Sequence, residues 1–275
     1  MLRHVTAIFL VIAFVFVDAD EAEARRRRGE AVGFYSDGSL WRGVPLTEDG
    51  RDHYLLYPQA CYDREPMVEA YPDEGRRGNY HANPRVIRGI LKVVRSLRRK
   101  HPDAPRVPVG ELSNKTGGKI PFHRSHQNGL DVDVFFLLRP RMDTPAGGPW
   151  KDAEKTVPLC HDGPELEVQD PKTGRWRVHG AFAHDWNWTL VSKFAAQEEV
   201  KVLFIGALLK RELARWSRRK SVPAKQRRRT LDKLKAVVCR HGHPDSRRGY
   251  RGNYCPHADH IHVRYHCPAD SPDCR

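Results

Sequence analysis

The N-terminal part of this chain lacks the features that would hold a protein in a membrane. Its apolar run, Ala7 to Val17, has 11 residues, whereas a helix needs about 20 residues to span a bilayer. No cysteine precedes Cys61, which argues against a lipid-modified N-terminus. Basic residues before the run and small residues up to Ala24 are typical of a secretory signal. We therefore expect residues 1–24 to be removed on export, with no stable membrane insertion afterwards; an uncleaved anchor is the alternative.

Cysteine is scarce, with six residues in a chain of 275. In an exported protein an even number indicates disulfides rather than free thiols, although the count leaves the pairing open. A structural zinc site is the alternative, although its spacing matches no standard ligand pattern. Its ligands would be Cys239, His241, His243 and either Cys255 or His257.

Acidic residues are too few to balance the basic ones, because 34 aspartates and glutamates against 48 lysines and arginines leave a formal net charge of +14. Basic runs at 25–28, 218–220 and 225–229 are typical of nucleic-acid-binding patches. An exported protein seldom meets nucleic acid, so we expect no nucleic-acid partner. We interpret the runs as solvated helix faces with a weak attraction to an anionic envelope; a basic nucleic-acid binder is the alternative.

The chain contains no internal repeat, and its order of elements mixes helices with an antiparallel sheet, which predicts the α+β class. Apolar residues at helical spacing predict a helix over 84–99, with Asn83 as its cap. We expect a basic linker at 25–35, one domain at 36–275 and a long loop at 140–180. Further helices are expected at about 187–198, 207–219 and 224–238, and strands at 106–113, 130–136, 200–206 and 260–265.

Four histidines lie close together near the C-terminus, in a chain that holds 15. In "HIHVRY" (260–265) apolar residues alternate with polar ones, the pattern of a half-buried strand, so His260 and His262 share one face. Side chains two apart on a strand lie about 6.5 to 7 Å apart. One imidazole can therefore bind a metal while the other reaches that metal's water.

A second set of candidate ligands lies in "HRSHQNGLDVDV". His126 is in a loop, Gly129 permits a sharp turn, and Asp133 follows on a strand. Two imidazoles and one carboxylate suit Zn²⁺ and leave a fourth position for water, which favours catalysis over a structural role. The alternative is that Asp133 caps a turn and His126 is exposed.

Taken together, "SHQNGLDVDVFF" and "HADHIHVRYHCPADSPDC" resemble the penicillin-insensitive murein endopeptidases. These belong to a wider group of zinc peptidases that includes lysostaphin-type enzymes, D-Ala-D-Ala peptidases and the hedgehog domain. The resemblance runs from about Ser36 to the C-terminus, although residues 140–180 and 217–255 depart from the family in length and content. It implies a zinc site on an antiparallel central sheet flanked by helices.

The resemblance implies His126, Asp133 and His262 as zinc ligands and places His260 beside the metal's water. His123 and His257 match two further family histidines, for substrate binding or the second shell; both could instead be loop histidines that bond a neighbour. One more carboxylate, Asp131, shares a strand face with Asp133 and could orient a ligand imidazole. A solvent-facing or turn-bonding aspartate is the alternative for Asp131.

Amide hydrolysis at neutral pH needs a hydroxide, and bound Zn²⁺ lowers the pKa of water to about 7 while it polarises the scissile carbonyl. His260 can accept the proton of that water or support the oxyanion, and His257 could protonate the leaving amine. The sequence does not decide which histidine does which.

The resemblance therefore implies a periplasmic zinc D,D-endopeptidase that cuts peptidoglycan cross-links, at the bond from D-alanine to diaminopimelate. β-Lactams should not inhibit it, because attack by a metal's water forms no acyl-enzyme. One alternative is a zinc D,D-carboxypeptidase or dipeptidase acting on free peptidoglycan peptides. Another is a non-catalytic cell-wall-binding protein on the same scaffold.

The last two cysteines, Cys267 and Cys274, flank "PADSPD", whose residues favour a tight turn, so we expect them to form a disulfide. The family resemblance in "CPADSPDC" supports this pairing. By elimination we pair Cys239 with Cys255 and Cys61 with Cys160.

Overall fold

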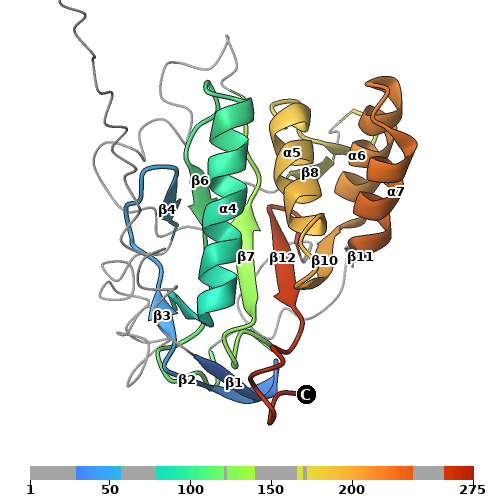
Figure 1. The fold of residues 1–275 in the computed structure, drawn as a ribbon. Helices are drawn as coiled ribbons and strands as arrows, with labels where there is room; N and C mark the ends of the chain where they lie inside the picture. Colours follow the sequence, from blue (N-terminus) through green and yellow to red (C-terminus); the bar gives the residue numbers. More distant parts are fainter. Residues whose placement is uncertain (1–28, 57–78, 121–122, 140–165, 170–171, 238–256) are drawn as a thin grey trace, which may run out of the picture.

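A six-stranded sheet forms the centre of the protein in the computed structural model, which describes residues 29–56, 79–120, 123–139, 166–169, 172–237 and 257–275 (Figure 1). Its strand order is β11-β10-β12-β7-β6-β4. The bounds are β4 (His53–Leu55), β6 (Val107–Val109), β7 (Asp131–Phe135), β10 (Val200–Gly206), β11 (Leu234–Val237) and β12 (His260–Tyr265).

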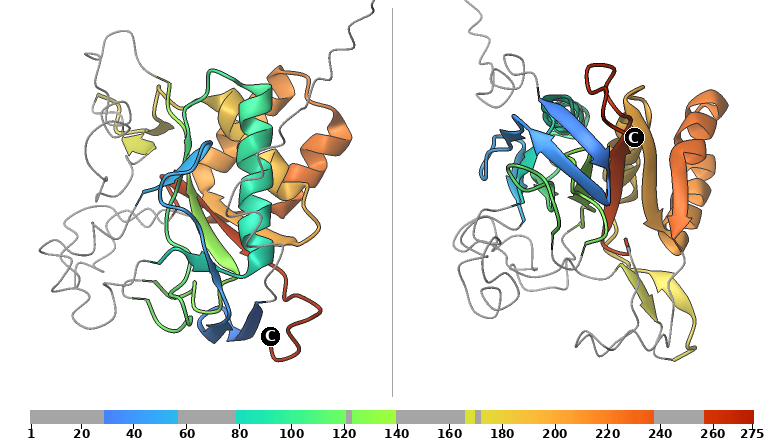
Figure 2. Two further views of the ribbon diagram at one scale, coloured as in Figure 1. Left: turned by 60° about the vertical axis from the view of Figure 1, so that its left-hand side comes forward. Right: turned by 90° about the horizontal axis from the view of Figure 1, so that it is seen from below.

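The four central strands of this sheet are antiparallel, and both edge strands join in parallel. Helices α4 (Pro84–Lys100) and α5 (His184–Ala195) pack in front of the sheet, and α6 (Ala207–Arg219) and α7 (Ala224–Lys233) lie at its β10–β11 edge (Figures 1 and 2). The predicted α+β class with an antiparallel centre is confirmed.

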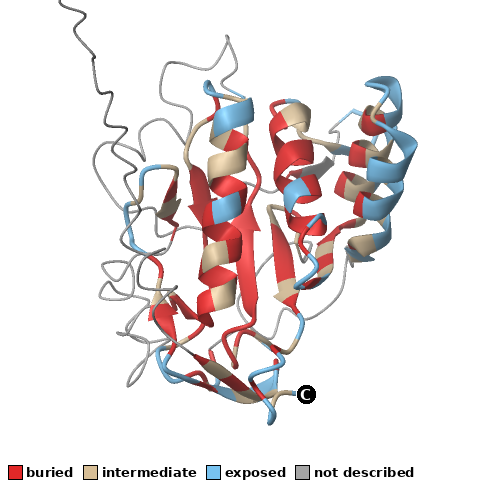
Figure 3. Ribbon diagram, viewed as in Figure 1, coloured by how far each residue is buried: buried red, intermediate tan, exposed pale blue. Residues whose placement is uncertain are grey.

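The two middle strands, β7 and β12, alternate between apolar and polar side chains up to Phe135, which ends β7 on the polar face. Val132 and Val134 on β7 and Ile261 and Val263 on β12 are fully buried and belong to one core with α4 and α5 (Figure 3). The opposite face of both strands carries histidines, aspartates and an arginine. Because side chains alternate along a strand, one register fixes both the core and the polar face.

Helix α4 begins where the sequence predicted. The Asn83 side chain accepts a 3.0 Å hydrogen bond from the Arg85 N–H, and Pro84 occupies the first turn. In its middle, Gly89 faces the core, where a Cβ atom would lie 2.3 Å from the Tyr265 hydroxyl oxygen. A glycine is therefore needed for α4 to approach the end of β12 so closely.

Three predicted elements differ from the structure. The helix expected over 224–238 ends at Lys233, and Leu234–Val237 forms β11 instead, because backbone pairing with β10 outweighs local helix propensity. The strand expected over 106–113 is limited to β6. Part of the expected 140–180 loop forms a hairpin of β8 (Glu167–Gln169) and β9 (Trp176–Val178); residues 140–165 and 170–171 lie outside the described residues.

The N-terminal hairpin consists of β1 (Glu30–Phe34), which the sequence analysis placed in the linker, and β2 (Asp37–Trp41), which it placed in the domain. It packs on the loop that precedes β7, where the Gln127 N–H donates to the Tyr35 carbonyl at 3.0 Å. The short pair β3 (Val44–Pro45) and β5 (His81–Ala82) lies nearby.

The predicted disulfide between Cys267 and Cys274 is present. The other four cysteines, Cys61, Cys160, Cys239 and Cys255, lie outside the described residues. Within the described part of the chain, no helix combines the length and apolar character that a membrane crossing requires.

Candidate metal centre

The polar face of β7 and β12 brings four side chains into direct register. His262 pairs with Asp133, and Arg264 pairs with Asp131. Both aspartates are at most 3% exposed, and His262 is 4% exposed. Two carboxylates this deeply buried need cationic partners, since a buried unpaired charge costs several kcal/mol.

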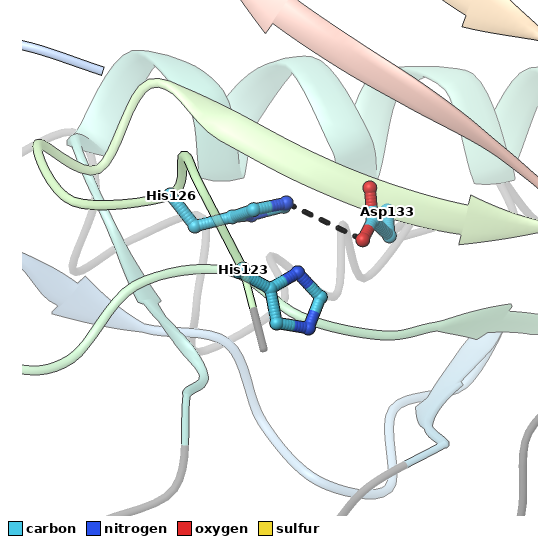
Figure 4. Close-up of side chains that lie close together, drawn as sticks. All are labelled: His123, His126 and Asp133. Atoms are coloured by element: carbon cyan, nitrogen blue, oxygen red, sulfur yellow. Dashed lines mark ion pairs between the residues drawn. The ribbon is translucent and has the colours of Figure 1, made fainter. Parts of the chain in front are cut away.

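His126 reaches the same place from the loop before β7. Its Nε2 lies 3.3 Å from Asp133 Oδ2, and its backbone N–H donates to Asp131 Oδ2 at 3.2 Å (Figure 4). The backbone of His126 has φ +68°, a left-handed conformation that is uncommon for a residue with a side chain. Its hydrogen bond to Asp131 offsets part of this strain.

His262 stands between the two carboxylates. Its Nδ1 lies 2.9 Å from Asp133 Oδ1, and its Nε2 lies 3.3 Å from Asp131 Oδ1. Metal-binding histidines commonly turn their second ring nitrogen to a carboxylate, which fixes the ring and raises its basicity. Asp131 has this position relative to His262.

The donor atoms fit a metal ion. Around tetrahedral Zn²⁺, with ligands at about 2.0 to 2.2 Å, neighbouring donor atoms lie about 3.3 to 3.5 Å apart. Asp133 Oδ2 is 3.3 Å from His126 Nε2, and the other oxygen, Oδ1, is 2.9 Å from His262 Nδ1, a little closer than that spacing; the two imidazole centroids are 4.7 Å apart. Among the described residues, the buried Asp133 Oδ1 forms an ion pair with His262 Nδ1 but no well-aligned hydrogen bond, so a cation would satisfy it.

His123 also contributes to this cluster. One donor atom each from His123, His126 and Asp133 lies within 4.8 Å of the others (Figure 4). The sequence analysis placed His123 in the second shell, whereas this distance puts it in reach of the same ion. His262 and His123 are therefore two candidates for the third ligand, and His262 has the Asp131 carboxylate 3.3 Å from its second ring nitrogen.

The charges of the cluster favour a cation at its centre. Burial raises the pKa of Asp133, but His126, His260 and His262 outweigh burial and hold it well below its usual range. Burial lowers the pKa of His262, but Asp131 and Asp133 outweigh burial and raise it to about 9. Two ionised carboxylates therefore demand positive charge here, which a proton or a metal ion can supply.

His260 and His257 form a second pair beside Asp133. His260 Nε2 lies 3.6 Å from Asp133 Oδ1 and 2.9 Å from His257 Nδ1, while His260 Nδ1 donates to Asp259 at 2.6 Å. Because an ionised carboxylate only accepts, Asp259 keeps a proton on Nδ1 and leaves Nε2 to exchange protons. Like His126, His257 has a left-handed backbone, with φ +61°.

The two histidines of this pair differ in basicity. Burial lowers the pKa of His260, but Asp133 and Asp259 outweigh burial and raise it above its ordinary value. Burial, together with the nearby His260 and His262, lowers the pKa of His257 to about 2. His260 is thus the stronger base, and His257 is neutral.

Comparison with known proteins identifies the family of this chain. The family described as penicillin-insensitive murein endopeptidase matches residues 73–275. This chain belongs to that family. The penicillin-insensitive murein endopeptidase of Yersinia enterocolitica is 24% identical over 246 residues, which cover 89% of this chain and 69% of the relative. That of Haemophilus influenzae is 27% identical over 249 residues, which cover 85% and 70%. The resemblance inferred from the two motifs is confirmed.

The sequence analysis missed two residues of this cluster, Asp259 and Arg264. Asp259 directly precedes His260, and a carboxylate beside a candidate base was the available signal. Arg264 shares the strand face of His262, two residues further on.

Asp131 is fully buried, which excludes the solvent-facing alternative for it. The alternative site at Cys239, His241, His243 and Cys255 lies outside the described residues.

Arg264 also binds the Asp131 carboxylate, beside His262. Its Nε and Nη2 donate to the two carboxylate oxygens at 2.8 and 2.9 Å, and its guanidinium lies 4.0 Å from the centre of the Tyr35 ring. A bidentate arginine fixes the plane of a carboxylate as well as its charge. Asp131, in turn, contacts both His126 and His262, so Arg264 supports the whole cluster.

Replacing Arg264 by glutamine should lower the free energy of unfolding by about 3 kcal/mol, because Asp131 then loses a buried charge partner. Chemical denaturation at neutral pH measures this. The matched control is Arg215→Gln, which removes an arginine that is 63% exposed and pairs with Glu212, and it should cost less than about 1 kcal/mol. Equal losses in the two variants would contradict a buried role for Arg264.

Proposed function

We propose that this protein is an exported, zinc-dependent endopeptidase that hydrolyses peptide cross-links of peptidoglycan in the periplasm. The observation that carries the proposal is the meeting of His126, Asp133 and His262 with the His260–His257 pair, in a chain of the murein endopeptidase family. The names of its relatives support action on murein. Export through residues 1–24 is part of the proposal.

In this proposal the metal is held by His126 Nε2, Asp133 and His262 Nδ1. When bound there, Zn²⁺ supplies a Lewis acid that polarises the scissile carbonyl and acidifies a water. Asp131 keeps the His262 ring in place through its second nitrogen. His123 lies at the edge of this set, where it can bind the substrate.

The proton is handled by His260 and His257. His260 Nε2 faces the metal-ligand Asp133 and can accept a proton from the attacking water, while Asp259 stabilises the imidazolium that forms. The 2.9 Å contact between His260 and His257 gives that proton a path away from the base. His257 can then pass a proton to the leaving amine, so in this proposal His260 is the base and His257 is the acid.

The proposed bond joins a D-alanine carbonyl to the side-chain amine of diaminopimelate in the neighbouring peptide. No residue of the cluster is a serine or cysteine nucleophile, so the proposed chemistry forms no acyl-enzyme for a β-lactam to mimic. A D,D-carboxypeptidase would use the same cluster on a free peptide end, and the products distinguish the two activities.

The purified protein should hold one zinc per chain, and His262→Ala should weaken zinc binding by more than about 100-fold, since even second-shell losses reach that size. His123→Ala is the matched test, because it removes the competing imidazole and should leave the zinc content near parental. Elemental analysis and chelator competition measure both. The opposite result would make His123 the third ligand.

His260→Ala should keep its zinc and fold but lose activity by about 10² to 10⁴-fold, the usual contribution of a general base. His266→Ala removes an exposed histidine just beyond β12 and should behave like the parent. Turnover of muropeptide dimers and metal content are measured together. If the zinc-loaded His260→Ala protein turned over substrate like the parent, His260 would not be the base. If the variant lost its zinc, His260 would be the metal ligand and His262 the base.

Cross-linked muropeptide dimers should become monomers with or without penicillin, and EDTA should abolish the reaction. Mass analysis of the fragments identifies the bond. Release of terminal D-alanine from monomers, with dimers left intact, would assign the carboxypeptidase activity instead. Inhibition by penicillin, or activity that survives complete metal removal, would contradict the mechanism.

A further inference from the structure

The positive charge of the protein is concentrated in one segment outside the candidate metal centre. Residues 207–237, which form α6, α7 and β11, contain twelve lysine or arginine residues and two acidic ones. This segment therefore contributes +10 to the formal net charge of +14. Because the charge is so unevenly distributed, the positive electrostatic potential of the protein is concentrated over this segment.

The exposed cations lie on the outer sides of α6 and α7. On α6, Arg211, Arg215 and Arg218 follow helical spacing, and the opposite stripe, including Leu209 and Leu213, is buried. Exposed residues cover the outward sides of both helices in Figure 3. We call the exposed lysines and arginines of this segment the basic face: Arg211, Arg215, Arg218, Arg219, Lys220, Lys225, Arg228, Arg229 and Lys235.

Acidic side chains neutralise little of this face. Glu212 pairs with Arg215 and Arg219 and also bonds His184, so one carboxylate serves three cationic or basic groups. The Arg229 guanidinium bonds only a backbone carbonyl, that of Ala196, which leaves its charge intact. Lys235 lies over the Phe204 ring, with its ammonium 5.4 Å from the ring centre. Among the described residues, five further exposed cations form neither an ion pair nor a cation–π contact: Arg211, Arg218, Lys220, Lys225 and Arg228.

We propose that the basic face docks the protein on an anionic phospholipid surface. Cations spread over two packed helices match the two-dimensional array of phosphates on a membrane. Among the described residues, the large apolar side chains that are exposed, Phe34 and Trp41, lie on β1 and β2, so the basic face offers no aromatic platform for nucleic-acid bases. The choice of lipid over nucleic acid also rests on the proposed function, because an exported protein meets membrane phosphates.

The basic face is separate from the metal centre. It lies at the β10–β11 edge of the sheet, whereas β7 and β12, which carry the histidines and aspartates, are middle strands (Figures 1 and 2). A protein held through α6 and α7 can therefore bind lipid and a peptide substrate at the same time. The attraction is electrostatic, so salt should weaken it.

The test is sedimentation of the full chain with phosphatidylcholine vesicles that contain about one quarter phosphatidylglycerol, compared with phosphatidylcholine alone. The parent should bind only the anionic vesicles and be released by high salt. Replacing the five unpaired cations by glutamine should weaken partitioning at least about 100-fold, since each cation near an anionic surface is worth roughly fivefold. All five are exposed, and thermal unfolding confirms that the variant is folded.

A control variant removes the same charge elsewhere, by glutamine at Lys92, Arg99, Lys115, Lys119 and Arg175, all exposed. Its partitioning onto anionic vesicles should weaken by less than about fivefold, because salt screens charges that lie far from the membrane. Equal losses in the two variants would show that total charge, and no particular face, drives binding. Equal binding to neutral vesicles, or tighter salt-matched binding to duplex DNA, would also overturn the proposal.

Hydrolysis of soluble muropeptide dimers is measured for both variants. If the parent hydrolyses no dimers, the proposed peptidase function is wrong, and the vesicle experiment still tests whether the basic face binds anionic lipid. If the five-residue variant hydrolyses dimers like the parent but does not bind vesicles, docking is separate from catalysis, as proposed.

Discussion

Strands β7 and β12 bury two carboxylates, Asp131 and Asp133, against a histidine and an arginine that lie directly opposite them. Burying these charges without partners would cost several kcal/mol each, which is a large part of the stability of a typical domain. The pairing therefore constrains the register of the whole sheet. A slip of one residue would turn Asp133 into the apolar core and Val132 out of it.

The same pairing supports the loops that reach the cluster. His126 and His257 both have left-handed backbones, which cost about 1 to 3 kcal/mol each when a side chain is present. Asp131 accepts the backbone N–H of His126, and the Gly206 N–H donates to the His257 carbonyl at 2.9 Å. Strained residues persist only where their surroundings hold them, so these contacts fix the backbone of both histidines beside the cluster.

The N-terminal hairpin and the C-terminal segment support the cluster from outside. Tyr35 lies against the Arg264 guanidinium and donates its hydroxyl proton to the Tyr265 carbonyl at 2.9 Å. The Ser271 hydroxyl, inside the disulfide loop, accepts the Ala31 N–H at 3.1 Å. Elements from both ends of the described chain thus hold Arg264, and through it Asp131, in one position.

The sequence by itself determined the elements with a clear period and the identity of the polar residues. Alternation in "HIHVRY", an apolar run in "VKVLFIG" and the Asn83-Pro84 start each matched a strand or helix closely, because each pattern is local. Only the tertiary structure decided that Leu234–Val237 is a strand, that Asp131 is buried beneath Arg264, and that Asp259 orients His260. These depend on contacts between residues far apart in the chain or on the exact direction of a side chain, and a one-dimensional pattern contains neither.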